Sequence, residues 1–229
     1  MSTEIPPSRP QSEALQILAT EHWSLLATRA LTYQESLGRV SMFLTVLSGA
    51  VISLALVAQA DRFGPTFISV AIFMLTIVFF VGVATVRRLL MLNRDDYMWV
   101  VGMNKIRHAY LEMHPELAPN FITSPHDDLP GALQTLGLGP ASAPSLGTVF
   151  HGFVTMPGML SVIVASVGAA IAGLAALGFG APAFGVLLTG LAAFAIVLAT
   201  MLWRGNRSFR RDGPGVEVSF PTPPKPPTS

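Results

Sequence analysis

Four long runs without a single charged side chain dominate the sequence. Each holds about 20 residues, and the runs are Ser41–Ala60, Thr66–Val86, Met159–Leu177 and Phe184–Trp203. A helix of that length, rising roughly 1.5 Å per residue, crosses the roughly 30 Å hydrocarbon core of a bilayer. Charged residues make up only 12% of the chain, against about 25% in soluble domains. We therefore expect an all-α, polytopic membrane protein with four transmembrane helices.

The four runs come as two pairs. Asp61–Pro65 separates the first two runs within residues 40–86, and Phe179–Pro182 separates the last two within residues 158–203. Glycine and proline in both separators stop one helix and start the next. The spacing predicts two transmembrane hairpins.

Residues 13–39 read as a separate amphipathic helix on the cytoplasmic side. Apolar side chains recur there at spacings of three and four, at Trp23, Leu26, Ala30, Tyr33 and Leu37. The face has two interpretations: it rests on the membrane surface or packs within its own domain, or it joins copies of the chain.

A cytoplasmic helix is also expected over residues 87–115, either as an extension of the second run or as an element of its own, and Pro115 ends it. Its apolar residues recur at close to seven-residue spacing and form a seam that needs a partner. We assign this seam to oligomerisation, with residues 13–39 as the nearest partner. The seam consists of Trp99, Met103, Ile106, Tyr110 and Met113.

Three segments lack a long periodic pattern. Residues 1–12 contain three prolines and are expected to be disordered. Residues 116–157 are rich in proline and glycine and are expected to be either a flexible linker between the two hairpins or a functional loop, in which Leu129–Leu138 is a candidate short helix. Residues 204–229 are first basic and then proline-rich, and we expect them to be a disordered tail.

Small residues recur every fourth position in the apolar runs. In lipid, such stripes let helix backbones approach closely. In the first run they are candidates for helix packing or, if the chain conducts, for lining a pore: Ser41, Thr45, Gly49 and Ser53, with the polar Gln59 nearby. In the second pair of runs they are helix-packing candidates: Ser161, Ala165, Gly168, Ala169, Ala172, Gly173 and Gly185.

Positive charge is sorted along the chain. Of the 14 Lys and Arg residues, only Arg62 lies between the members of a pair of runs. The positive-inside rule then places both termini in the cytoplasm and both short turns outside. We expect a multi-pass protein of the inner (plasma) membrane whose main partner is the lipid bilayer.

The sequence offers little for catalysis. The four runs contain no Asp, Glu, Lys, Arg or His, so a proton relay within the membrane is not expected. No cysteine is present, and a net charge of +1 does not favour nucleic acid. We predict no enzyme activity and no cofactor. A metal site is the minority interpretation of a histidine- and carboxylate-rich stretch, with His114, Glu116, His126, Asp127 and Asp128 as its possible ligands.

Two resemblances bear on function. The segments Glu21–Arg29 (EHWSLLATR), Gly38–Leu44 (GRVSMFL) and Leu47–Val51 (LSGAV) resemble a bacterial integral-membrane family of unknown function. The order of a helix, two spans and a helix over residues 13–115 is similar to the SLATT-type two-span effector domains. That similarity implies a pore-forming effector, and the extra pair of runs at 159–203 departs from it.

We therefore expect an oligomeric membrane protein, a channel or pore in its leading interpretation. The alternative is a non-conducting scaffold or accessory subunit that holds a cytoplasmic protein partner.

Overall fold

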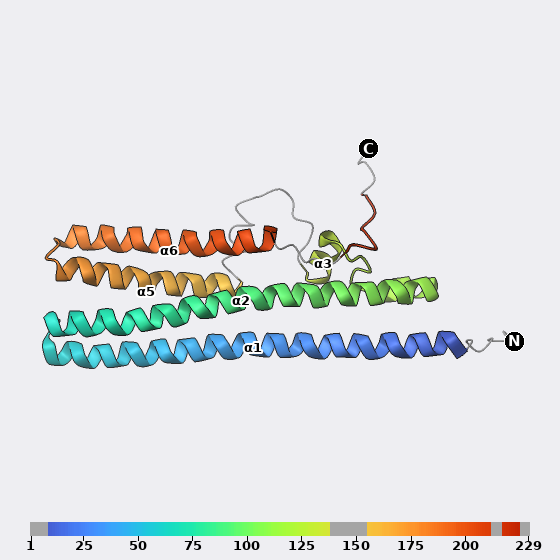
Figure 1. The fold of residues 1–229 in the computed structure, drawn as a ribbon, viewed down its shortest axis with the longest axis horizontal. Helices are drawn as coiled ribbons and strands as arrows, with labels where there is room; N and C mark the ends of the chain where they lie inside the picture. Colours follow the sequence, from blue (N-terminus) through green and yellow to red (C-terminus); the bar gives the residue numbers. More distant parts are fainter. Residues whose placement is uncertain (1–8, 138–154, 212–216, 225–229) are drawn as a thin grey trace. The chain divides into compact units, whose positions relative to one another are not determined.

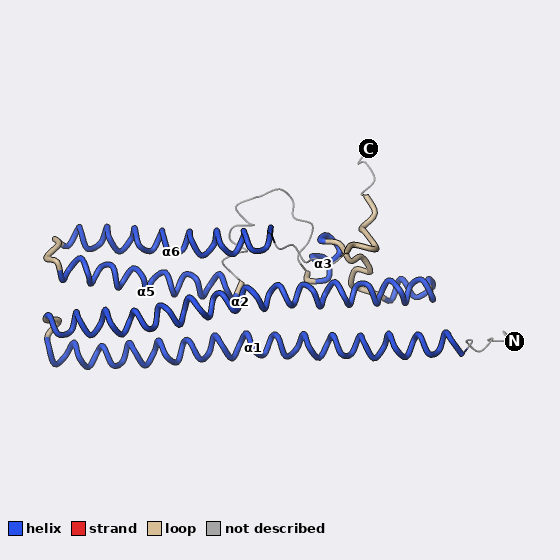
Figure 2. The backbone as a smooth tube through the Cα atoms, in the orientation of Figure 1, coloured by secondary structure: helices blue, strands red, loops and turns tan. Residues whose placement is uncertain are grey.

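The computed structural model describes residues 9–137, 155–211 and 217–224. Within these ranges the regular structure is entirely helical and contains no strand. The helices, in chain order, are α1 (Arg9–Asp61), α2 (Pro65–Met113), the 3-10 helix η1 (Pro115–Asn120), α3 (Leu129–Thr135), α5 (Met156–Gly178) and α6 (Ala183–Arg211) (Figure 1 and Figure 2). The all-α expectation is confirmed for the described part of the chain.

Four of these helices are long and apolar enough to cross a membrane, namely α1, α2, α5 and α6. Each contains one of the four uncharged runs of the sequence. The number of candidate spans is therefore as predicted.

The helix expected over residues 13–39 is not a separate element, whereas the helix expected over residues 87–115 extends the second span, one of the two alternatives left open for it. Residues 13–39 are the first part of α1, and residues 87–113 are the last part of α2. No proline interrupts either junction, and Gly38 alone does not end a helix because one glycine costs only about 1 kcal/mol. The prediction of a boundary near residue 40 was wrong for that reason.

The turn between α1 and α2 is fixed by its first residue. The backbone N–H of Gly64 donates to the Asp61 carbonyl at 2.9 Å, and the Phe67 N–H donates to the Asp61 carboxylate at 2.7 Å. Arg62 and Phe63 take positive φ values of 46° and 60°. The carboxylate thus caps the start of α2 while the chain reverses.

The chain divides into two compact units. One contains Gln34–Asn93 and Pro144–Gly213, and the other contains Met1–Tyr33, Arg94–Ala143 and Pro214–Ser229. We call them the span unit and the head unit and describe each by itself.

In the span unit, three helices meet at a glycine. A Cβ atom added at Gly82 of α2 would lie 2.6 Å from Val164 Cγ2 of α5 and 2.9 Å from the ring of Phe43 of α1. Phe43 and Val164 are fully buried there. Gly82 is therefore the point where α1, α2 and α5 approach most closely among these contacts.

Helices α5 and α6 lie side by side within this unit (Figure 1). A Cβ at Gly190 would lie 3.4 Å from the Ala169 carbonyl oxygen, and one at Gly173 would lie 3.6 Å from Val186 Cγ1. Helix α5 begins with a cap in which the Thr155 hydroxyl accepts a hydrogen bond from the Gly158 N–H. Small residues thus set the spacing of the two helices.

The head unit has its own apolar cluster around the last part of α2. Its buried members are Tyr97, Val100, Val101, Met103 and Ala132, with Leu25 and Leu136 packed against them. Leu25 of α1 also lies against Gly102, whose added Cβ would be 3.1 Å from Leu25 Cδ1. The core therefore combines α1, α2 and α3.

Besides the apolar side chains Leu25 and Phe43, polar side chains of α1 contact α2. Arg29 Nε lies 2.6 Å from Asp96 in the head unit, and Glu35 bonds both Arg88 of α2 and its own neighbour Arg39 in the span unit. The predicted apolar face is exposed along its whole length, with Trp23 at 69%. Packing of this face within its own domain was therefore the wrong interpretation.

Candidate functional site

The most connected polar site of the described chain lies in the head unit, where residues 217–224 dock on α2 and the segment before α3. We call Lys105, His108, Asp127 and Asp128 the docking site and residues 217–224 the docked segment. Lys105 and His108 lie one turn apart on α2, and the two aspartates immediately precede α3. The site thus joins three stretches of sequence.

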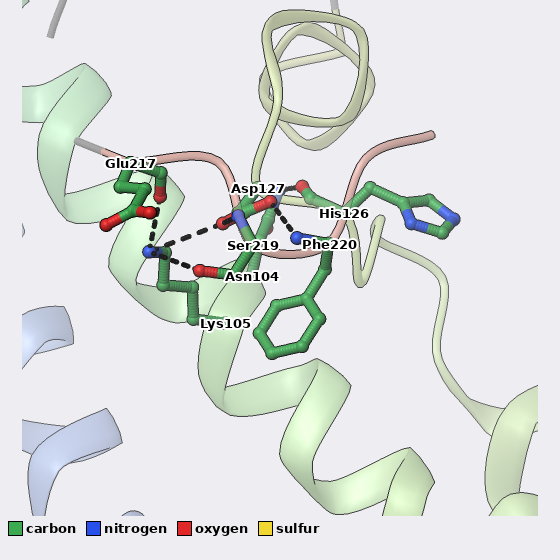
Figure 3. Close-up of polar contacts among 7 residues, drawn as sticks. All are labelled: Asn104, Lys105, His126, Asp127, Glu217, Ser219 and Phe220. Carbon is green, nitrogen blue, oxygen red and sulfur yellow. Dashed lines mark hydrogen bonds and ion pairs between the residues drawn. The ribbon is translucent and has the colours of Figure 1, made fainter. Parts of the chain in front are cut away.

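Asp127 holds the backbone of the docked segment (Figure 3). Its carboxylate accepts the N–H of Ser219 at 2.8 Å and the N–H of Phe220 at 2.7 Å. Its own N–H donates to the Phe220 carbonyl at 3.2 Å. The side chain of Asp127 is completely buried. Such charge-assisted bonds are about twice as strong as neutral ones, so this residue anchors the segment.

Lys105 supplies the countercharge. Its Nζ lies 3.3 Å from the Asp127 carboxylate and donates to the Glu217 carbonyl at 2.8 Å (Figure 3). It also reaches the Ser219 hydroxyl at 3.4 Å. One ammonium group therefore binds both the buried carboxylate and the backbone that the carboxylate holds.

Asp128 performs two tasks at once. It caps α3 by accepting the Gly131 N–H at 2.9 Å, and it accepts both the N–H and the hydroxyl of Thr222, each at 2.7 Å. The docked segment is therefore held at two points, through Asp127 and through Asp128.

Phe220 provides the apolar part of the contact. Its ring stacks on the imidazole of His108 with a centroid distance of 3.8 Å and an interplanar angle of 18°. The backbone N–H and carbonyl of Phe220 both form hydrogen bonds with Asp127. These bonds and the stacking contact together fix the position of the ring.

Buried Asn104 holds the chain that carries the aspartates against α2. Its amide nitrogen donates to the His126 carbonyl at 2.7 Å (Figure 3). Its amide oxygen accepts from the Arg107 guanidinium at 2.6 Å and from the Thr135 hydroxyl at 3.0 Å. Asn104 therefore holds both ends of the stretch from His126 to Thr135, the last residue of α3.

Gly131 allows the tight approach of α3 to the preceding turn. A Cβ atom there would collide with the backbone of His126, because the His126 carbonyl carbon lies only 2.8 Å from its position. Any other residue would push α3 away from Asp128, whose carboxylate caps it.

The two carboxyl groups are stabilised in their charged forms. Burial raises the pKa of Asp127, but the N–H groups of Ser219 and Phe220 and the ammonium of Lys105 outweigh that effect and hold the pKa below its ordinary value of 3.8. Burial also raises the pKa of Asp128, and the bonds from Thr222 and Gly131 bring it below 3.8 as well. Both groups are therefore negative at neutral pH.

The docked segment falls in the region predicted to be a disordered tail. The structure instead gives residues 217–224 a defined place, and α6 continues to Arg211. The order arises from contacts about 92 to 94 positions away along the chain. No local periodicity signals such contacts, and the sequence showed only His-Asp-Asp at 126–128.

The minority metal interpretation is not supported. Among residues 9–137, 155–211 and 217–224, no group of three or more His, Asp or Glu side chains could hold a metal ion. His114 pairs with Glu116 at 3.0 Å, while Asp127 and Asp128 bind the docked segment. The same residues are thus used for a protein contact.

The predicted stripe of the first run lies on an exposed face of α1. Its members are Ser41, Thr45, Gly49, Ser53 and Gln59. Thr45 donates its hydroxyl to the Ser41 carbonyl at 3.0 Å, and Ser53 donates to the Gly49 carbonyl at 2.9 Å. A Cβ at Gly49 would meet nothing within 4 Å. All five residues are exposed in the described part of the chain, and the role of the stripe stays a prediction.

The small residues of α5, unlike the exposed stripe of α1, are buried or partly buried. Ser161, Ala165 and Gly173 are buried, and Ala169 and Ala172 are partly buried. A Cβ at Gly168 would lie 3.1 Å from the Phe79 ring, whereas Gly185 of α6 faces only Ala181 and Pro182 of its own turn.

The predicted oligomerisation seam is largely covered within the chain. Met103 and Ile106 are buried, while Trp99, Tyr110 and Met113 are partly exposed. Of the five seam residues, the three that could contact another copy are therefore Trp99, Tyr110 and Met113.

The four apolar helices indicate the class of this chain, a multi-pass membrane protein. No match to the chain was found among protein families, curated proteins or solved structures.

Proposed function

We propose that this chain is an oligomeric integral membrane protein that forms a channel between copies. The observation that carries the proposal is the exposed stripe of α1 from Ser41 to Ser53, which bears hydroxyl groups and a glycine. A polar, small-residue face turned away from the rest of the chain suits close contact with another copy or a narrow water path.

In this proposal the four spans form two membrane hairpins, α1 with α2 and α5 with α6. The uneven distribution of Lys and Arg supports cytoplasmic termini and two short external turns. The protein then belongs to the inner (plasma) membrane, and most of its polar residues face the cytoplasm.

Self-association draws further support from the start of α1. Large apolar side chains are exposed there, including Ile17, Trp23, Leu31 and Tyr33. Exposed apolar patches of this kind mark protein or membrane contacts. We assign this face to the neighbouring copy, continuous along α1 with the stripe that begins at Ser41.

A non-conducting scaffold is the second candidate. The hydroxyls of Thr45 and Ser53 already bond backbone carbonyls, which reduces their capacity to replace an ion's water shell. The four apolar runs also contain no ionisable side chain that could attract an ion. On this view the same faces hold copies or a cytoplasmic partner together.

Ion flux through purified protein in liposomes separates the two candidates. The channel predicts flux above that of empty vesicles, and it predicts that Gly49→Leu abolishes the flux because a branched side chain enters the contact face. Gly178→Leu serves as a matched control, since Gly178 lies at the end of α5. Flux equal to empty vesicles over a range of voltages and cations would favour the scaffold.

A further inference from the structure

The docked segment behaves as a bound peptide rather than as part of a helical fold. Residues 217–224 contain no helix or strand, and their hydrogen bonds go to Lys105, Asp127 and Asp128. Pro221 and Pro223 lack the N–H group that a helix needs, and the chain bends just before them at Ser219 and Phe220. Its place is set by the docking site alone.

Recognition at this site has two parts. The first part reads a bent backbone, because the single carboxylate of Asp127 accepts two successive N–H groups at the bend of Ser219 and Phe220, and the Asp127 N–H donates to the Phe220 carbonyl (Figure 3). The second part reads side chains, through the His108 stack with Phe220 and the Asp128 bond to the Thr222 hydroxyl. Backbone bonds give affinity and alternate side chains give specificity in peptide recognition of this kind.

We propose that the docking site is a recognition site for a bent Ser-Phe-Pro-Thr segment, filled here by the chain's own residues 219–222 and able to take the same segment from a second copy. The exchange between copies rests on the proposed self-association. The recognition of the segment itself does not.

The charges of the site fit this ligand. The site presents one ammonium and two carboxylates, and His108 adds an imidazole. Lys105 neutralises Asp127, so the remaining acceptors are filled only when backbone N–H groups arrive. An empty site would leave a buried carboxylate with two unmet hydrogen bonds, which disfavours the empty state. Release of the chain's own segment is therefore expected when another such segment replaces it.

The first test is binding of a fluorescent synthetic peptide with the sequence of residues 217–224 to the full-length protein in detergent. The chain's own segment competes with the peptide for the docking site. The apparent affinity of the wild-type protein for the peptide is therefore the intrinsic affinity multiplied by the fraction of empty sites. Phe220→Ala in the protein weakens that competitor, and we expect the peptide to bind at least about tenfold more tightly.

Two controls fix the site. Asp127→Asn added to the Phe220→Ala protein should abolish the gain, and a peptide that itself carries Phe220→Ala should bind neither protein. Equal binding to the single and double variants, or no binding to either, would overturn the proposal.

A second measurement uses only the wild-type protein and avoids any folding defect of the variants. Excess unlabelled peptide should accelerate hydrogen exchange at the backbone amides of Ser219, Phe220 and Thr222, because these amides lose their partners when the segment leaves. Exchange that stays unchanged at millimolar peptide would contradict displacement.

Exchange between copies is tested by cross-linking. The chain lacks cysteine, so a single Val218→Cys substitution within the docked segment can carry a photoreactive maleimide. The Val218→Cys protein is co-expressed with a tagged Phe220→Ala protein, and we expect a cross-link between the two. The cross-linked product should disappear when the tagged protein also carries Asp127→Asn. Peptide binding without such a product would retain the recognition site and reject the exchange, whereas a monomeric protein would reject the proposed oligomer.

Discussion

Asp127 carries a negative charge that is completely buried, and its partners are spread over two distant stretches of sequence. Burying a carboxylate is unfavourable unless hydrogen bonds and a countercharge compensate for lost water. Lys105 and the N–H groups of Ser219 and Phe220 provide that compensation. The residue is thus stable only as long as the docked segment is in place.

Asp127→Asn should release the docked segment. The amide keeps the shape of the carboxylate but removes its charge, and hydrogen bonds to a charged group contribute about 1.5–3 kcal/mol. A loss of about 2 kcal/mol corresponds to roughly 30-fold faster hydrogen exchange at the Ser219 and Phe220 amides. Asp95→Asn on α2 is the control and should leave exchange unchanged. A change below threefold in the Asp127 variant would contradict the assigned role.

Acid should release the segment as well. Both carboxyl groups have a folded-state pKa below the unfolded value of 3.8, so their stabilisation is complete above that pH. It declines as pH falls below 3.8 and is lost once pH passes the folded-state pKa values. The other titratable side chains that contact the segment are Lys105 and His108.

Fluorine NMR of 4-fluorophenylalanine at position 220 measures this transition. The stacked ring should give one signal at pH 6 and a second, solvent-exposed signal that grows below about pH 4. The Asp127→Asn and Asp128→Asn double variant should show the exposed signal at both pH values. An exposed signal that does not grow at all between pH 6 and the acid unfolding of the protein would refute the dependence on these carboxylates.

Helices α1 and α2 illustrate how glycine position decides between packing and exposure. Gly82 faces Phe43 and Val164, whereas Gly49 faces open space within the chain. The same substitution therefore tests internal packing at one site and external contact at the other.

Gly82→Leu should destabilise the span unit. Its new side chain would collide with two fully buried side chains, and overpacking of this kind costs typically 1–3 kcal/mol. For a chain of this size each kcal/mol lowers the thermal midpoint by about 2–4 °C, which a thermal scan in detergent resolves. Gly49→Leu should leave the midpoint unchanged in the monomer. Equal effects of the two substitutions would contradict the packing described here.

The same helices show what the sequence predicts well. Lipid solubility depends on local composition, so the four uncharged runs identified all four candidate spans. The turn at Asp61–Pro65 was also recognisable, because proline and glycine act locally. The continuity of α1 across residue 40 was missed because a change of polarity was taken for a change of element.

Non-local contacts were beyond the sequence. Arg29 and Glu35 each pair with a residue of α2 more than 50 positions away, and no local pattern in the sequence indicates these pairs. Residues 217–224 appeared disordered because proline-rich composition lacks a periodic pattern. Their order depends on Asp127, whose His-Asp-Asp context gives no indication of a peptide ligand.

The proposed oligomer predicts a definite effect on the mass of the complex. The detergent-solubilised protein should have a protein mass that is a multiple of 24.4 kDa. Gly49→Leu should shift it toward the monomer, because close helix approach in lipid depends on small residues. Gly178→Leu is the control and should keep the larger mass. A wild-type protein of one chain per complex would reject both the channel and the self-associating scaffold.

The central claim is that four helices cross the bilayer and return the chain to its starting side. Since the chain contains no cysteine, single cysteines placed in intact cells report the side directly with a membrane-impermeant maleimide. Phe63→Cys and Phe179→Cys, both in exposed turns, should react from outside, whereas Leu117→Cys and Val218→Cys should react only after the membrane is opened. Reaction of Phe179→Cys and Leu117→Cys from the same side would contradict the four-span arrangement.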